Sequence, residues 1–174
     1  MEIILNDSEQ KLAIYVARKR YESSRKSGIV NAKKGPQSNE QTDLEGIGAE
    51  IAFCKMFNVY PDLGEGCPYA DAWTLELGSV DVKATKWRKG RLLAQPSKIN
   101  LEKVDNYVLM VGQFPSYRYV GSASSEELLH PQSITDMGHG PVYALNQSQL
   151  KQKWLTKQNH QQKWSPSYLE ELIA

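Results

Sequence analysis

The stretch Ser79-Val80-Asp81-Val82-Lys83-Ala84-Thr85 alternates between two kinds of side chain. Successive side chains of a β-strand point to opposite faces, so this stretch predicts a strand with Asp81, Lys83 and Thr85 on one polar face. A second strand is expected at residues 72–77, and the pair Gly78-Ser79 predicts a tight hairpin between the two strands. The alternation therefore places a carboxylate and an ammonium group on the same face of a hairpin.

Asp71 stands at the head of the first of these strands. The hairpin turns the chain back, so the carboxylates of Asp71 and Asp81 are expected to approach each other. Two such carboxylates repel each other unless a cation joins them. Carboxylate oxygens, with the Val82 carbonyl between them, suit Mg²⁺ or Mn²⁺ better than Zn²⁺, since no His or Cys stands beside them. The sequence therefore predicts a site for a hard divalent cation.

A helix is expected before this hairpin, with Thr42 or Asp43 as its cap. Apolar residues follow at helical spacing, namely Leu44, Ile47, Ile51, Cys54 and Phe57. Glu50 lies between Ala49 and Ile51, beside this apolar stripe. A carboxylate near a core needs a partner, which makes Glu50 a candidate functional residue.

The remaining patterns predict an α/β fold of the α+β kind. An N-terminal helix is expected at residues 8–26, capped by Asp7 or Ser8, and a loop at 27–42. The apolar run 107–112 predicts a buried central strand, with residues 117–123 beside it. Further strands are expected at 91–94 and 142–145, a short helix from Ser124 or Ser125, and basic helices over 146–174. We expect one domain, residues 1–174, whose core at about 42–145 holds a mixed central β-sheet flanked by helices.

Glu50 on a helix, Asp71 after a gap, and Asp81-Val82-Lys83 on a strand together resemble the PD-(D/E)xK nuclease superfamily, also called restriction-endonuclease-like. The resemblance covers roughly residues 42–123, and Ala70 stands where the family signature has a Pro. It implies a restriction-endonuclease-like core and metal-dependent hydrolysis of DNA phosphodiester bonds. DNA is accordingly the expected partner, and a homodimer is compatible with this interpretation.

The resemblance also implies a role for each site residue. Asp71 and Asp81 would bind Mg²⁺ or Mn²⁺, and Glu50 would hold a second ion or its water. Lys83 would orient the attacking water and stabilise developing charge, and we expect it to stay protonated beside two carboxylates. Glu45 is the alternative helical acid. Glu50 is preferred because its apolar flanks indicate burial, whereas Glu45 is expected in the first helical turn.

The chain has 21 Lys and Arg against 20 Asp and Glu, but its basic residues are clustered. One cluster follows the predicted catalytic strand and includes an aromatic residue: Lys86, Trp87, Arg88, Lys89 and Arg91. A basic turn with an aromatic side chain is suited to phosphate contact and base stacking, so we expect it to bind DNA. The alternative is a solvated hairpin in which Trp87 caps the core.

Composition excludes several classes of protein. None of the 174 residues lies in an apolar run approaching the 18 that a membrane span needs. The N-terminal residues do not resemble a secretory signal, so we expect a cytoplasmic protein in which Cys54 and Cys67 are free thiols. No Ser-His-Asp arrangement, phosphate-binding loop or dinucleotide-binding glycine pattern is present. The alternatives to a nuclease are a DNA- or protein-binding module that does not cut, and a structural or small-molecule domain.

Overall fold

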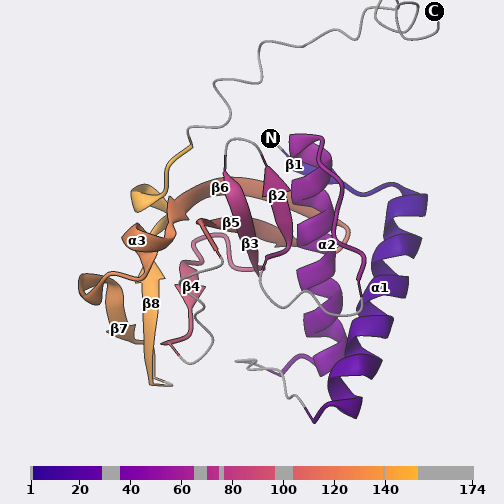
Figure 1. The fold of residues 1–174 in the computed structure, drawn as a ribbon, viewed down its shortest axis with the longest axis horizontal. Coiled ribbons are helices and arrows are strands. Elements are labelled where there is room, and N and C mark those ends of the chain that lie inside the picture. The colour runs from indigo at the N-terminus through magenta and orange to yellow at the C-terminus, as the bar shows by residue number, and fades with distance from the viewer. Residues whose placement is uncertain are drawn as a thin grey trace, which may run out of the picture.

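A computed structural model describes residues 2–28, 36–64, 70–74, 77–96, 104–138 and 140–152 of the protein. Within these residues the strands of the central sheet follow the order β1-β6-β5-β3-β2 (Figure 1). Their bounds are β1 Glu2–Ile4, β6 Ser116–Ser124, β5 Asn106–Gln113, β3 Gly78–Thr85 and β2 Ala72–Thr74. β3 and β5 are parallel and the other neighbours are antiparallel, so the sheet is mixed, as the sequence predicts.

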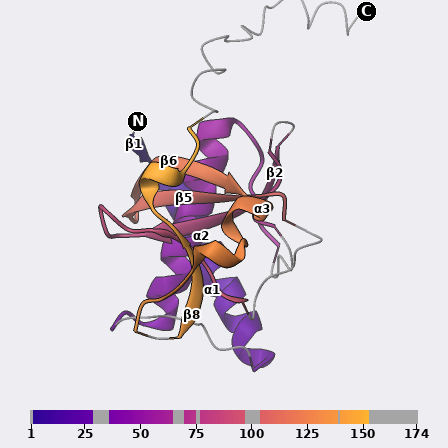
Figure 2. The same ribbon diagram turned by 90° about the vertical axis from the view of Figure 1, so that its left-hand side faces the viewer.

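The two faces of this sheet are covered differently (Figures 1 and 2). Helices α1 (Asp7–Lys26) and α2 (Asn39–Phe57) pack on one face. A smaller sheet lies on the other, formed by β4 (Leu92–Ala94), β8 (Pro141–Leu145) and β7 (Ile134–Asp136), together with helix α3 (Ser125–Leu128). Two 3-10 helices, Pro131–Ser133 and Gln147–Gln149, follow α3 and β8.

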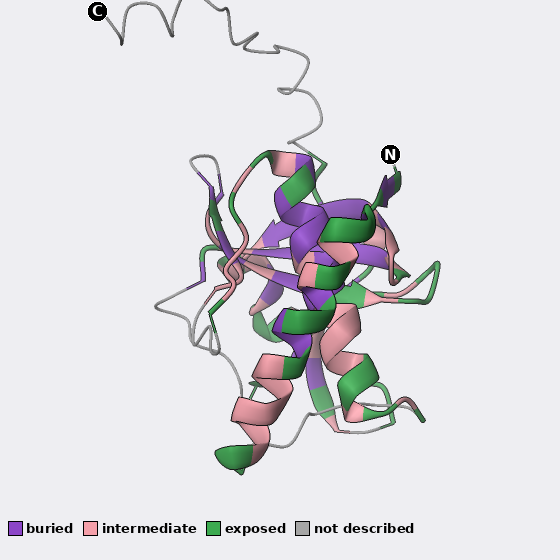
Figure 3. Ribbon diagram, turned by 90° about the vertical axis from the view of Figure 1, so that its right-hand side faces the viewer, coloured by how far each residue is buried: buried purple, intermediate pink, exposed green. Residues whose placement is uncertain are grey.

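The alternation of β5 explains why two cores form. Val108 and Met110 face the helices, whereas Leu109 and Val111 face the smaller sheet. A strand that is buried on both faces must be apolar at every position, which is why this run is continuous in the sequence. Figure 3 shows the strands of the central sheet mostly buried and the exposed residues on the outer faces of the two helices.

The helices begin earlier than their apolar patterns indicate. The cap of α1 is Asn6, whose side chain accepts from the Glu9 amide in a capping box, and not Asp7 or Ser8. The cap of α2 is Ser38 and not Thr42 or Asp43. The first turn of α2 is polar, so it carries no periodic signal, and the predicted loop at 27–42 is correspondingly too long.

The hairpin also differs from the prediction in one respect. Gly78 pairs with Thr74 and Ser79 with Trp73, so Gly78 and Ser79 belong to β3 and not to the turn. Gly78 adopts φ +64, and Asp105 accepts hydrogen bonds from the backbone and hydroxyl of Ser79, each at 2.8 Å. The backbone therefore needs glycine at this point for its positive φ and not for a two-residue turn.

Two short strands, β1 and β7, were not predicted. Basic helices were predicted over residues 146–174. The described part of this range forms a 3-10 helix at Gln147–Gln149, and residues 153–174 lie outside the described residues. Among the described helices, none has the length and apolar character that crossing a bilayer requires.

Candidate functional site

Asp71 lies at the open edge of the central sheet. Its amide donates to the Val80 carbonyl at 2.8 Å, and its Oδ2 accepts from the Val82 amide at 2.7 Å. The pairing of β2 with β3 reaches only to Val80, so the Asp71 carboxylate takes the place that a neighbouring strand would occupy beside Val82. The N–H and C=O of one strand residue point to the same edge, so the Val82 carbonyl faces this edge too.

Asp81 and Lys83 form an ion pair on the polar face of β3. The Lys83 Nζ lies 2.6 Å from Asp81 Oδ1 and donates to Asp81 Oδ2 at 2.7 Å. Asp81 Oδ1 is buried and, despite that short distance, lacks a partner in hydrogen-bond geometry. One oxygen of this carboxylate is therefore left with electrostatic contact alone.

Tyr107 is a further neighbour of this pair. It lies opposite Asp81 in the parallel pairing of β3 with β5. Burial and then the Asp81 charge raise the pKa of the Tyr107 hydroxyl, and Lys83 acts in the opposite direction. The sequence showed Tyr107 only as part of an apolar run, so its position beside the ion pair follows from strand register alone.

Glu50 has a basic partner that the sequence did not reveal. Arg20 of α1 donates to Glu50 Oε2 at 2.9 Å, and the two side chains are only 15% and 12% exposed. Arg20 also donates to the carbonyls of Asp62 and Gly64, at 2.9 and 3.1 Å. The sequence placed Arg20 only within a run of basic residues, and nothing in its spacing singles it out as the partner of Glu50.

Glu45 lies elsewhere on α2 and has a structural role. Its Oε2 accepts from the Phe114 amide at 2.9 Å and from the Tyr117 hydroxyl at 3.1 Å. A Cβ at Gly48 would meet this same hydroxyl, so glycine permits the close approach of α2 to β6. Glu45 therefore fixes the helix on the turn between β5 and β6, although it stands beyond the first turn of α2.

The acidic side chains interact electrostatically across the site. Burial and then Asp81 raise the pKa of Asp71 to about 6, against the opposing effects of the Val82 amide, Lys83 and Arg20. Burial and then Asp71 raise the pKa of Glu50, although Arg20 acts to lower it. Three carboxylates therefore share two cationic partners, and when all three are ionised one negative charge is not compensated.

Lys83 keeps its proton in this environment. Burial acts to lower the pKa of the Lys83 ammonium, but the charge and hydrogen bond of Asp81 outweigh it and the pKa is raised. This direction suits an electrostatic role for Lys83 and not a role as a base.

The fit of a metal ion depends on which oxygens remain available. Among the described residues, no three His, Cys, Asp or Glu side chains are grouped closely enough to hold an ion. Asp71 and the Val82 carbonyl provide hard oxygen donors at the edge, and Asp81 is near enough to raise the pKa of Asp71, whereas Glu50 is occupied by Arg20. Mg²⁺ accepts such a sparse set because it commonly keeps several waters and uses one or two carboxylates. The residues fit Mg²⁺ or Mn²⁺ on these terms.

The basic turn after β3, residues Lys86, Trp87, Arg88, Lys89 and Arg91, is exposed throughout. Trp87 is 69% exposed and so does not cap the core, and the Lys86 ammonium lies 5.4 Å from its ring centroid. Gln147 donates to the carbonyls of Arg88 and Gly90, each at 2.9 Å, which holds the turn against the C-terminal part of the fold. An aromatic ring and four cations are thus presented to solvent directly after the strand of Asp81 and Lys83.

The two cysteines and the remaining basic residues of the sequence can be placed only in part. Cys54 is a buried free thiol, as expected, and burial followed by Glu50 raises its pKa to about 12. Cys67 lies outside the described residues, as do Lys33 and Lys34 in the predicted loop at 27–42. A further basic cluster in the sequence, Lys151, Lys153, Lys157 and Lys163, lies, apart from Lys151, within residues 153–174, which are not described.

The chain was compared with protein-family models, with curated proteins and with solved structures, and none of them matches. Membership of the PD-(D/E)xK superfamily and a restriction-endonuclease-like core therefore stay predictions from the residues.

Proposed function

We propose that this protein is a metal-dependent deoxyribonuclease whose ion is held by Asp71, Asp81 and the Val82 carbonyl. The observation that carries the proposal is the Asp71 carboxylate at the open edge of the sheet. Burial and Asp81 raise its pKa to about 6, so the fold brings acidic groups together without fully compensating them. A divalent cation relieves such repulsion, which is the arrangement expected of a metal site.

The residues would divide the work of phosphodiester hydrolysis. A bound Mg²⁺ supplies Lewis acidity, which lowers the pKa of water and neutralises charge on the phosphate. Lys83 is protonated and is oriented by Asp81 at 2.7 Å, so it would stabilise charge that develops on the phosphate oxygens. Arg20 keeps Glu50 in place, and Glu50 would orient water toward the phosphorus. The basic turn would bind the flanking phosphates of DNA.

A non-catalytic DNA- or protein-binding module is the second candidate function. It is favoured by the internal pairing of the acids, since Asp81 binds Lys83, Glu50 binds Arg20 and Asp71 binds the Val82 amide. In such a module these contacts would be purely structural, and the basic turn would bind its partner without hydrolysis.

Cleavage and metal binding separate the two functions. The protein is incubated with supercoiled, linear and single-stranded DNA in Mg²⁺, Mn²⁺ or EDTA, and Mn²⁺ binding is measured by calorimetry. We expect cleavage with either metal, its loss in Lys83→Ala, and loss of Mn²⁺ binding in Asp81→Asn. Arg18→Gln is the matched control, because Arg18 belongs to an exposed helical ion pair with Glu22. A protein that binds DNA but neither cuts it nor binds Mn²⁺ would be the binding module.

A further inference from the structure

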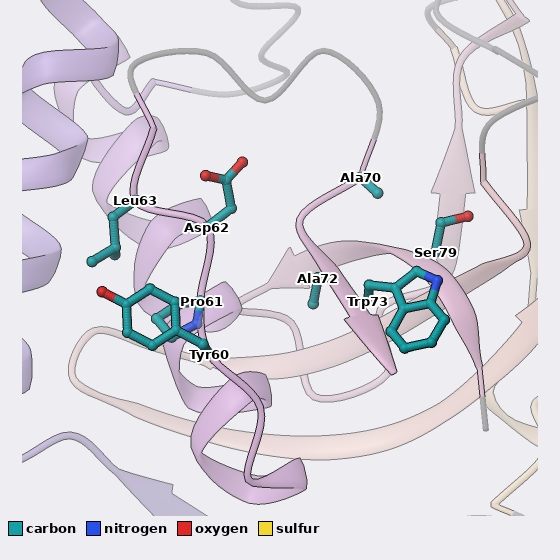
Figure 4. Close-up of a pocket in the computed structure, with 8 residues that line it drawn as sticks. All are labelled: Tyr60, Pro61, Asp62, Leu63, Ala70, Ala72, Trp73 and Ser79. Carbon is teal, nitrogen blue, oxygen red and sulfur yellow. The ribbon is translucent and has the colours of Figure 1, made fainter. Parts of the chain in front are cut away.

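The polar face of β3 extends beyond the Asp81–Lys83 ion pair onto the neighbouring strand. Trp73 of β2 pairs with Ser79 of β3, and the side chains of paired residues project from the same side of a sheet. Ser79, Asp81 and Lys83 point to the same side of β3, and Trp73 shares this side. Figure 4 shows the Trp73 ring on the side of β2 opposite Ala72, which is buried against the helices. Trp73 therefore lies on the same surface as the ion pair.

The basic turn folds onto the far end of this face. Thr85 also projects from the polar face of β3, because it follows Lys83 by two residues. The Thr85 hydroxyl accepts from the Trp87 amide at 3.3 Å, and a Cβ at Gly90 would meet the Thr85 side chain. The turn therefore contacts the polar face at Thr85, and it places Trp87 at the end of the face remote from Trp73.

Two exposed tryptophans thus flank the ion pair. Trp73 is 63% exposed and Trp87 is 69% exposed, so both rings present apolar area to solvent. From Ser79 to Thr85 the strand spans about 20 Å, at about 3.3 Å per residue. Large exposed rings at both ends of one face are typical of a binding surface, and they favour a partner that offers flat groups at intervals along its length.

The charges along this face favour a partner that carries phosphates. Residues 82–96 contain no Asp or Glu, and they include five cations: Lys83, Lys86, Arg88, Lys89 and Arg91. The Lys86 ammonium lies 5.4 Å from the centroid of the Trp87 ring, so a cation and a stacking surface stand together. At the other end, Asp105 accepts from the Ser79 hydroxyl at 2.8 Å, so an uncharged ring is favoured over a phosphate beside Trp73.

A DNA strand with unpaired bases has the matching chemistry. Its bases are flat and uncharged, its phosphates are anionic, and both recur along its length. Proteins that bind single strands combine a positively charged groove with aromatic side chains on which successive bases stack. A duplex would satisfy the cations of the turn, but its base faces cover one another and would leave both tryptophan rings without a partner.

We propose that the polar face of β3 is the path of a single-stranded DNA segment, which stacks one base on Trp73, crosses the Asp81–Lys83 pair and stacks another base on Trp87. Its phosphates bind to Lys83 and to the cations of the basic turn. Between the two bases the backbone passes the proposed metal site, where a bound ion offsets the acidic charge. This inference rests on the proposed action on DNA and narrows the substrate to single-stranded or locally opened DNA.

Binding in EDTA tests this inference without cleavage, and low salt strengthens the phosphate contacts of the turn while no metal ion offsets the acids. Fluorescence anisotropy measures the affinity for a labelled oligothymidine, for the same strand with abasic sites and for a duplex. We expect Trp73→Ala and Trp87→Ala each to weaken oligothymidine binding about tenfold and to leave abasic-strand binding unchanged. The double variant should lose about a hundredfold, because rings about 20 Å apart contribute independently to the binding of one strand.

Two variants serve as controls. Trp73→Phe keeps an aromatic ring at this position and should retain most of the affinity for oligothymidine. Tyr15→Ala removes a ring that is 62% exposed on α1, which packs on the opposite face of the sheet, and should bind oligothymidine as the wild type does. Both tryptophans are exposed, so their alanine variants should keep the wild-type midpoint in urea denaturation.

The outcomes separate this inference from the function on which it rests. Oligothymidine binding that is unchanged in either alanine variant, or an equal loss for the abasic strand, would overturn the path along β3. Tighter binding of duplex than of oligothymidine by the wild-type protein would overturn it too, and cleavage and Mn²⁺ binding would still decide the proposed nuclease. A wild-type protein that binds no DNA at low salt would overturn both.

Discussion

Replacing Asp71 by Asn removes a buried negative charge whose pKa the fold raises. The pKa of Asp71 is raised from 3.8 to about 6, first by burial and then by Asp81. At about 1.4 kcal/mol per pKa unit, ionising this group costs the metal-free fold on the order of 3 kcal/mol. An Asn side chain can still accept from the Val82 amide through its carbonyl oxygen, so the local hydrogen bond is retained.

The sign of the pH dependence follows from the raised pKa. The folded state holds the Asp71 proton more tightly than the unfolded chain does, so the stability from this group is complete below about pH 4 and is lost as pH rises through about 6. We therefore expect Asp71→Asn to stabilise the metal-free protein by up to about 3 kcal/mol at pH 8 and to have little effect at pH 4. Urea denaturation in EDTA at the two pH values measures the difference.

Metal addition completes this experiment. Mn²⁺ should stabilise the wild-type protein at pH 8 and should have little effect on Asp71→Asn, since a ligand stabilises only the state that binds it. Glu127→Gln is the control, and its effect on stability at pH 8 should have the opposite sign. The hydrogen bond from Lys151 lowers the pKa of Glu127, so the variant should lose up to about 1 kcal/mol of stability at pH 8. If Asp71→Asn is less stable than the wild type at pH 8 in EDTA, the electrostatic account of the site is refuted.

Three further predictions concern the surroundings of the site. Arg20→Met should cost about 3–5 kcal/mol in urea denaturation at pH 9, where Glu50 is ionised because its pKa is raised to about 8, since it leaves this buried carboxylate without its partner; a cost below 1 kcal/mol at pH 9 would show that Glu50 is not held as an ion. Glu45→Ala should lower stability by about 1–3 kcal/mol through the lost contact with Phe114 while leaving Mn²⁺ binding unchanged in calorimetry; loss of Mn²⁺ binding would make Glu45 the helical acid. Arg88→Gln should reduce the slope of log DNA affinity against log salt concentration by about one, the change expected for one lost phosphate contact. Titrations at several salt concentrations measure this slope, and an unchanged slope would remove Arg88 from the interface.

Local patterns in the sequence were sufficient for most strands and for the polar face of β3. The alternation around Asp81 and Lys83 fixes which side chains share a face, because strand geometry repeats every two residues whatever surrounds it. The continuous apolar run within β5 predicted a central strand, because a strand that is buried on both faces has apolar side chains at successive positions. The strand β1 was missed because it is defined by its pairing with β6, which lies far along the chain, and β7 was missed as well.

The sequence by itself thus determined the periodic part of this protein: the mixed sheet, the helical position of Glu50 and the hairpin that brings Asp71 toward Asp81. Only the tertiary structure decided that Arg20 is the partner of Glu50 and that Tyr107 lies beside the ion pair. These residues belong to different elements, and their proximity depends on how the elements pack. Periodicity carries information along one element, whereas contacts between elements depend on packing that no local pattern encodes.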